Sequence, residues 1–173
     1  GDDTGWDEIA GIEGLIGSAF NDTRTGNDED NILIGGLGAD TLDGAEGSDT
    51  ASYEKAAAGV TVDLSGSVAN TGEAAGDTLT AIENLIGSPF ADVLYGDTLD
   101  NTLSGGAGAD KLYGGEGKDL LRGEAGNDQL YGQDGDDVLV GGDGADAYDG
   151  GAGSNTASYR NAADGNLGDD TTG

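Results

Sequence analysis

The sequence contains no cysteine, no histidine, no methionine and only one proline. Without cysteine the chain cannot form a disulfide, so a stable fold must be held together in another way. Without histidine or cysteine, zinc and copper sites are not expected, and the common catalytic triads are excluded. No unrepeated carboxylate stands out as a catalytic acid or base either, so the residues present predict a protein that is not an enzyme.

Basic residues are also scarce, with six Lys and Arg against 35 Asp and Glu, which gives a formal charge of −29. Such a chain does not bind nucleic acid or an anionic membrane through its own charge, and its natural small partners are cations. No apolar run approaches the roughly 18–20 residues of a membrane span. The absence of a signal-peptide pattern and of an initiator Met favours a mature product or a segment of a larger parent chain.

Glycine is abundant, with 36 residues, and its spacing is regular. Residues 105–149 read GGAGADKLY GGEGKDLLR GEAGNDQLY GQDGDDVLV GGDGADAYD, with Gly first and fourth, Asp sixth and usually Leu eighth. A composition this rich in glycine and charge is otherwise typical of disorder. The strict period of nine indicates a solenoid instead.

The nine-residue register divides the chain into five segments. Residues 17–52 hold four nonapeptides and residues 87–158 hold eight. The other segments are a lead-in coil (1–16), irregular connecting coils (53–86), and an exit with a frayed tail (159–173). Residues 7–44 align without gaps on 77–114, with 20 of 38 positions identical. The connection could be a flexible linker, but the strand patterns VTVDL (60–64) and DTLTAIENLI (77–86) favour a continuing solenoid.

One nonapeptide consists of a six-residue glycine turn followed by a three-residue strand. Two facing columns of eighth-position side chains fill a thin core if each coil takes 18 residues. Tyr95, Tyr113 and Tyr131 lie 18 apart at outward positions and are expected to stack, which we favour over glycan binding. The pattern therefore predicts an all-β parallel solenoid. The core positions are Leu33, Leu42, Leu94, Leu103, Leu112, Leu121, Leu130 and Leu139, then Tyr148.

The sixth-position aspartates would stack at about 4.8 Å in such a solenoid. Two carboxylates about 5 Å apart repel by roughly 3 kcal/mol at an effective dielectric constant of 20. Ca²⁺ reverses this repulsion because it accepts six to eight oxygens in flexible geometry, whereas Mg²⁺ demands an octahedron. The alternative is that the aspartates are only turn residues. That alternative explains neither their fixed position nor the repeated charge penalty.

GGAGADKLY, GGEGKDLLR and GGDGADAYD resemble the nonapeptide of RTX (repeats-in-toxin) proteins, GGxGxDxUx. The resemblance covers most of residues 17–52 and 87–158. It implies a right-handed parallel β-roll with one Ca²⁺ between stacked turns, and folding driven by calcium. It also implies export from a bacterium by a type I system, with folding outside the cell.

The resemblance assigns metal ligands to two positions of the repeat. We expect about three strong sites, between Asp110 and Asp128, Asp128 and Asp146, and Asp119 and Asp137, with up to about five weaker ones. Non-glycine fourth positions (Phe20, Glu29, Phe90, Leu99) and Asn at the sixth (Asn31, Asn101, Asn155) mark the weaker turns. The predicted carboxylate ligands are Asp22, Asp40, Asp49, Asp92, Asp110, Asp119, Asp128, Asp137 and Asp146. The predicted carbonyl ligands are those of Gly106, Gly108, Gly115, Gly117, Gly126, Gly135, Gly142 and Gly144.

Three functional interpretations follow from the sequence. The first is a non-enzymatic, extracellular calcium-binding β-roll that acts as a structural or secretion module of a bacterial surface or matrix protein. The second is an accessory module of a larger secreted enzyme or toxin, such as a protease, a lipase or an alginate epimerase. The third is an adhesin or a filament- or layer-forming subunit, because open solenoid ends without polar caps favour end-to-end stacking.

Overall fold

The computed structural model describes residues 14–158, so the predicted lead-in before residue 14 and the predicted exit at 159–173 lie outside the described residues. Within residues 14–158 nearly all regular structure is short parallel strands, and one 3₁₀ helix spans Gly72–Ala74. None of these residues forms a helix of the length and apolarity that crossing a bilayer requires.

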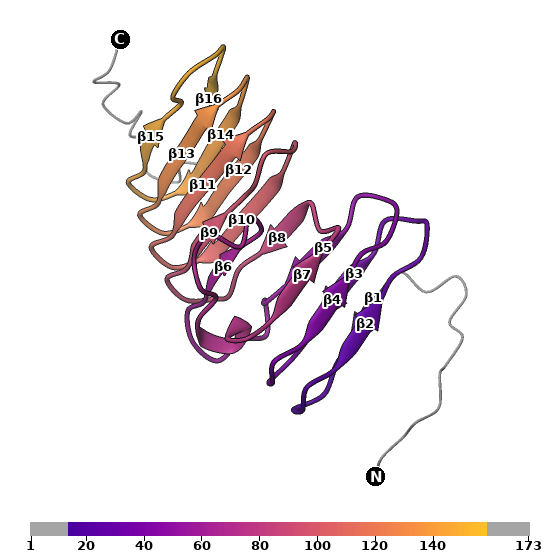
Figure 1. Cartoon of the computed structure of the whole chain (residues 1–173). Helices are drawn as coiled ribbons and strands as arrows, with labels where there is room; N and C mark the ends of the chain where they lie inside the picture. The colour runs from indigo at the N-terminus through magenta and orange to yellow at the C-terminus, as the bar shows by residue number, and fades with distance from the viewer. Residues whose placement is uncertain (1–13, 159–173) are drawn as a thin grey trace.

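The strands form two walls that face each other across a thin core (Figure 1). The first wall is one sheet of β1 (Gly14–Ile16), β3 (Ile32–Ile34), β5 (Thr50–Ser52), β8 (Asn84–Ile86), β10 (Thr102–Ala107), β12 (Leu120–Ala125), β14 (Val138–Asp143) and β16 (Thr156–Ser158). The second wall holds two sheets. One is β2 (Thr23–Thr25), β4 (Thr41–Asp43) and β7 (Thr78–Thr80); the other is β6 (Thr61–Asp63), β9 (Val93–Tyr95), β11 (Lys111–Glu116), β13 (Gln129–Asp134) and β15 (Ala147–Asp149).

The strand register confirms the 18-residue coil. Within the first wall Leu103 is paired with Leu121, and Leu121 with Leu139. Within the second wall Leu94, Leu112 and Leu130 follow one another in the same way. The prediction of an all-β parallel solenoid is therefore confirmed.

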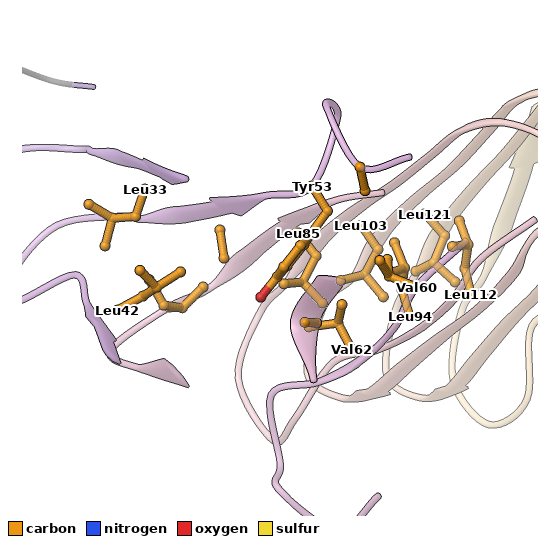
Figure 2. Packing of buried hydrophobic residues seen from close by; sticks show 14 of the residues in the cluster. Leu33, Leu42, Tyr53, Val60, Val62, Leu85, Leu94, Leu103, Leu112 and Leu121 are labelled. Atoms are coloured by element: carbon orange, nitrogen blue, oxygen red, sulfur yellow. The ribbon is translucent and has the colours of Figure 1, made fainter. Parts of the chain in front are cut away.

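The core is a double row of leucines between the walls, and Figure 2 shows part of it. A three-residue strand turns only its middle side chain inward, so each repeat contributes one core residue. Tyr148 takes the last position of its row and is half-buried. The fully buried leucines are Leu33, Leu42, Leu85, Leu94, Leu103, Leu112, Leu121, Leu130 and Leu139.

The connection between the two nonapeptide blocks is built into the roll. Thr50 of β5 is paired with Asn84 of β8, 34 residues later, so the first wall continues across it. The additional residues supply β6, which is paired with β9, and a loop that returns to β7, which is paired with β4. The strand patterns of VTVDL and DTLTAIENLI are confirmed as β6, β7 and β8.

The predicted tyrosine ladder is also confirmed. The rings of Tyr95 and Tyr113 stack with centroids 4.7 Å apart, and Tyr113 stacks on Tyr131 at the same separation. Offset or parallel ring pairs at this separation contribute about 0.5–1.5 kcal/mol beyond area burial. The ladder therefore reinforces the stacking of coils on the outer surface of β9, β11 and β13.

Replacing Leu112 with alanine should destabilise the folded roll by about 2–5 kcal/mol, because the neighbouring coils cannot collapse into the cavity. Leu112 is fully buried, between Leu94 and Leu130. The measurement is urea unfolding in saturating calcium. Leu99→Ala is the matched control, since Leu99 is 55% exposed, and we expect a change of about 0.5 kcal/mol or less. Equal effects of the two changes would contradict a core of single leucines.

Candidate metal centre

The sixth-position side chains form the predicted columns along the two edges of the roll, and each carboxylate joins two coils. The Oδ1 atom of Asp128 accepts the backbone N–H of Asp110 at 2.9 Å, and Oδ1 of Asp110 accepts that of Asp92 at 2.8 Å. The same bond runs from Asp119 to Asp137 at 3.0 Å on the other edge. One oxygen of each carboxylate is thus committed to the coil before it.

The second oxygen of six of these carboxylates has no partner. Each of the six atoms is buried and accepts no hydrogen bond. A buried polar atom without a partner costs about 1–3 kcal/mol, and more when it is charged, so native proteins rarely leave one without a reason. The six atoms are Oδ2 of Asp40, Asp49, Asp110, Asp119, Asp128 and Asp137.

These six aspartates share a turn geometry that we call the open turn. In each open turn the second residue has a positive φ, between 74° and 116°. Ala45, Glu124 and Gln133 hold this geometry without being glycine, so the second-position glycine can be replaced while the turn stays open. The open turns are residues 35–40, 44–49, 105–110, 114–119, 123–128 and 132–137.

The first two turns of each block have a different geometry, the closed turn. Here the second residue has no positive φ, and its N–H donates to the sixth side chain of the same turn. Ser88 N–H donates to Oδ2 of Asp92 at 2.6 Å, and Asp97 N–H donates to Oδ1 of Asn101 at 2.8 Å. The closed turns are residues 17–22, 26–31, 87–92 and 96–101.

Closed turns give Asp22 and Asp92 hydrogen-bond donors at both oxygens. Oδ2 of Asp92 accepts the Ser88 N–H, and its Oδ1 accepts the N–H of Val60 at 2.7 Å. In Asp22 the Ser18 N–H fills the same role, and the guanidinium of Arg24 lies 3.3 Å from Oδ1. Arg24 thus takes the place that Val60 has in the second copy. Their prediction as metal ligands stays a prediction, with competing donors already in place.

The fourth-position carbonyls point along the roll from one coil to the next. The carbonyl oxygen of Gly108 lies against Gly126, where a Cβ would be 1.4 Å from it and φ is +151°. Only glycine fits there, because an added side chain would collide with the backbone. Among the described residues no backbone N–H donates to the oxygens of Gly108, Gly117 or Gly126. These carbonyls therefore have lone pairs to offer near the unpartnered carboxylate oxygens.

Burial makes the charged form of these carboxylates costly. It raises the pKa of Asp110 to about 7, although the hydrogen bond from Asp92 N–H acts in the opposite direction. Burial likewise raises the pKa of Asp119 and that of Asp128 to about 6, and the neighbouring charge of Asp137 or Asp146 adds to it. A nearby cation would remove this cost by favouring the charged form.

The donor set fits calcium. Within residues 14–158 no point gathers three or more acidic side chains, so an ion here has to take most of its oxygens from the backbone. Ca²⁺ accepts carbonyl and carboxylate oxygens together in six- to eight-fold coordination. Unpartnered buried carboxylate oxygens and free glycine carbonyls are the ligands it requires.

Three partners of the aspartate columns were not found from the sequence. Oδ1 of Asp77 accepts Asp40 N–H at 2.8 Å, and its Oδ2 accepts the hydroxyl of Tyr53 at 3.0 Å. The side chain of Glu83 accepts Asp49 N–H at 2.9 Å, as a sixth-position residue would. The only available signal was the duplication, which repeats the SYxxA text and the IE dipeptide without giving them a role.

Comparison with known families agrees with this geometry. A family model described as the RTX calcium-binding nonapeptide repeat matches the chain in four copies, at residues 16–51, 86–121, 95–130 and 122–157. The matches cover well over half of the chain. A search of curated proteins returned no match. The calcium-binding repeat is a structural module, and the chain belongs to the RTX family of calcium-binding nonapeptide-repeat proteins.

Proposed function

We propose that this chain is an extracellular β-roll that folds on binding calcium after secretion from a bacterium, and that it serves as a structural or secretion module of a surface or matrix protein. The observation that carries the proposal is the set of six buried carboxylate oxygens without a partner. They occur only in turns that also offer free glycine carbonyls. A role built on periodic, metal-committed carboxylates is structural rather than catalytic.

We place the ions between successive open turns of one edge. Asp110 with Asp128, and Asp119 with Asp137, are pairs in which both members have an unpartnered oxygen. Asp128 and Asp146 make a third pair, although Asp146 is only half-buried and lies at the end of its column. The carbonyls of the fourth-position glycines complete the ligand set. In the first block Asp40 and Asp49 hold one unpartnered oxygen each and supply weaker sites.

Calcium dependence follows from the charge. With a formal charge of −29, the chain resists compaction, and the open turns bring buried carboxylates together without a compensating cation. Calcium bound only to the folded state stabilises it in proportion to the logarithm of its concentration. A calcium-poor cytosol and a calcium-rich exterior would therefore keep the open turns unfolded before export and fold them afterwards.

The test is a calcium titration followed by far-UV circular dichroism, with magnesium as the control. We expect a cooperative rise in β signal between about 10⁻⁴ and 10⁻³ M calcium, the range of extracellular modules. Magnesium at the same concentrations should have little effect, because it demands octahedral geometry and dehydrates reluctantly. A β signal that is already complete in chelator, or that magnesium restores equally well, would contradict the proposal.

A further inference from the structure

We infer that residues 50–104, the central segment, form a folded unit that needs no calcium, and that the calcium-binding coils are built outward from it in both directions. This inference rests on the proposed calcium role of the open turns. It concerns which part of the chain is folded before the metal arrives.

The first argument is the distribution of unpartnered oxygens. Of the six in the described residues, those of Asp40 and Asp49 precede residue 50, and the other four follow residue 104. The central segment contains buried carboxylates too, at Asp63, Asp77 and Asp92. Buried acidic residues are therefore present throughout, and only those outside the central segment have an oxygen without a donor.

The second argument is that neutral donors take the place of a cation inside the central segment. The hydroxyl of Tyr53 donates to Asp77, and the N–H of Ser88 donates to Asp92. Asp63 accepts the N–H and hydroxyl of Ser65 at Oδ1, and the N–H of Val68 at Oδ2. Carboxylates satisfied by hydroxyl and backbone donors do not require a metal to be buried.

The third argument is the density of the core. Of the sixteen buried hydrophobic residues, ten lie in the central segment, whereas residues 105–158 contribute one leucine per nonapeptide. Strand pairing inside the segment joins β5 to β8, β8 to β10 and β6 to β9. The ten are Ala51, Tyr53, Ala56, Val60, Val62, Ala74, Ile82, Leu85, Leu94 and Leu103.

The closed turns then have a defined role as the ends of this unit. Phe90 occupies the fourth position of the closed turn 87–92, and the turn that stacks on it has glycine at that position. A Cβ on Gly108 would lie 2.6 Å from the backbone of Phe90, so only a glycine-containing turn can follow. The closed coil presents a finished surface on which the first open turn, 105–110, can be laid.

The experiment is hydrogen–deuterium exchange of the full chain, read by mass spectrometry in chelator and in millimolar calcium. In chelator we expect amides of residues 50–104 to exchange at least about tenfold more slowly than those of 105–146. The protection should be modest because a unit of this size is marginally stable. In calcium, both regions should be protected. Equal, fast exchange of both regions in chelator would overturn the inference, while protection of 105–146 by calcium would still support the proposed function.

A single-atom variant tests the neutral-donor argument. Tyr53→Phe removes the hydroxyl that Asp77 accepts and leaves a buried carboxylate oxygen without a donor. Protection of residues 50–104 in chelator should fall by about tenfold or more, as expected for an unsatisfied buried acceptor. Tyr113→Phe is the matched control, because Tyr113 contributes its ring to the outer ladder. If both variants leave the protection unchanged, Tyr53 does not replace a cation and the inference fails.

Discussion

Asp128→Asn is expected to have opposite effects with and without calcium. In saturating calcium the variant should be less stable than the parent protein, with the folding midpoint shifted on the order of tenfold to higher calcium, because calcium affinity depends on the number of charged ligands. In chelator the same variant should be more stable, by about 1–3 kcal/mol. It removes one buried charge that repels its column neighbours.

The structure favours asparagine as the replacement. Asn31, Asn101 and Asn155 already occupy sixth positions, and Oδ1 of Asn155 accepts Asp137 N–H at 2.8 Å in the same way as an aspartate. The bond from Asp110 N–H to residue 128 should therefore survive, so the change isolates the charge and the second oxygen. An alanine would remove the inter-coil bond as well.

The measurement is the β signal against calcium concentration, with Asp134→Asn as the matched control. Asp134 is exposed at the third position of the neighbouring turn, and its replacement makes the same change in net charge. The control should shift the midpoint by less than about twofold, as expected for a solvent-exposed charge. An Asp128→Asn variant that behaves like the control at both calcium concentrations would rule out Asp128 as a shared ligand.

The coil could be predicted from the sequence because each repeat has one side chain that must be buried and one carboxylate in a fixed place. Leu103 and Leu121 can lie on the same face only if 18 residues make a coil, and their pairing has that spacing. The tyrosine ladder followed from the same arithmetic. Periodicity is a strong signal when a single register satisfies every repeat.

The division into open and closed turns depended on contacts that the period does not encode. Asp92 and Asp110 occupy the same position in the repeat, yet Ser88 N–H reaches Asp92 while nothing reaches Oδ2 of Asp110. The difference lies in φ of the second residue, and Glu124 has the same open geometry as glycine. Residue identity alone therefore separates the two classes incompletely.

Residues that act at breaks in the period were also out of reach. Arg24 stands at a core position, and its role became clear only from the contact with Asp22. The pair of Tyr53 and Asp77 joins residues 24 apart through an irregular connection. The pairing of β6 with β9, and of β7 with β4, likewise depends on a 34-residue spacing that occurs once.

Mild acid should partly replace calcium. Burial raises the pKa of Asp110 to about 7 and the pKa of Asp119 and that of Asp128 to about 6, above the value of about 3.9 in an unfolded chain. Between these values the folded, calcium-free roll binds more protons than the unfolded chain. Its stability in chelator therefore rises as the pH falls from about 8 to about 5.5, and this gain is lost as the pH rises through the folded pKa values.

The expected size is considerable, because one pKa unit corresponds to about 1.4 kcal/mol and three carboxylates contribute. Exchange protection of residues 105–146 in chelator, measured at both ends of this range, reports the effect directly. The triple variant with Asn at positions 110, 119 and 128 should lose most of this pH dependence. Protons and calcium compete for the same oxygens, so in calcium the sign reverses and the folding midpoint rises as the pH falls. A parent protein whose protection in chelator is flat over this range, or falls with acid, would show that these carboxylates are not buried together in the calcium-free roll.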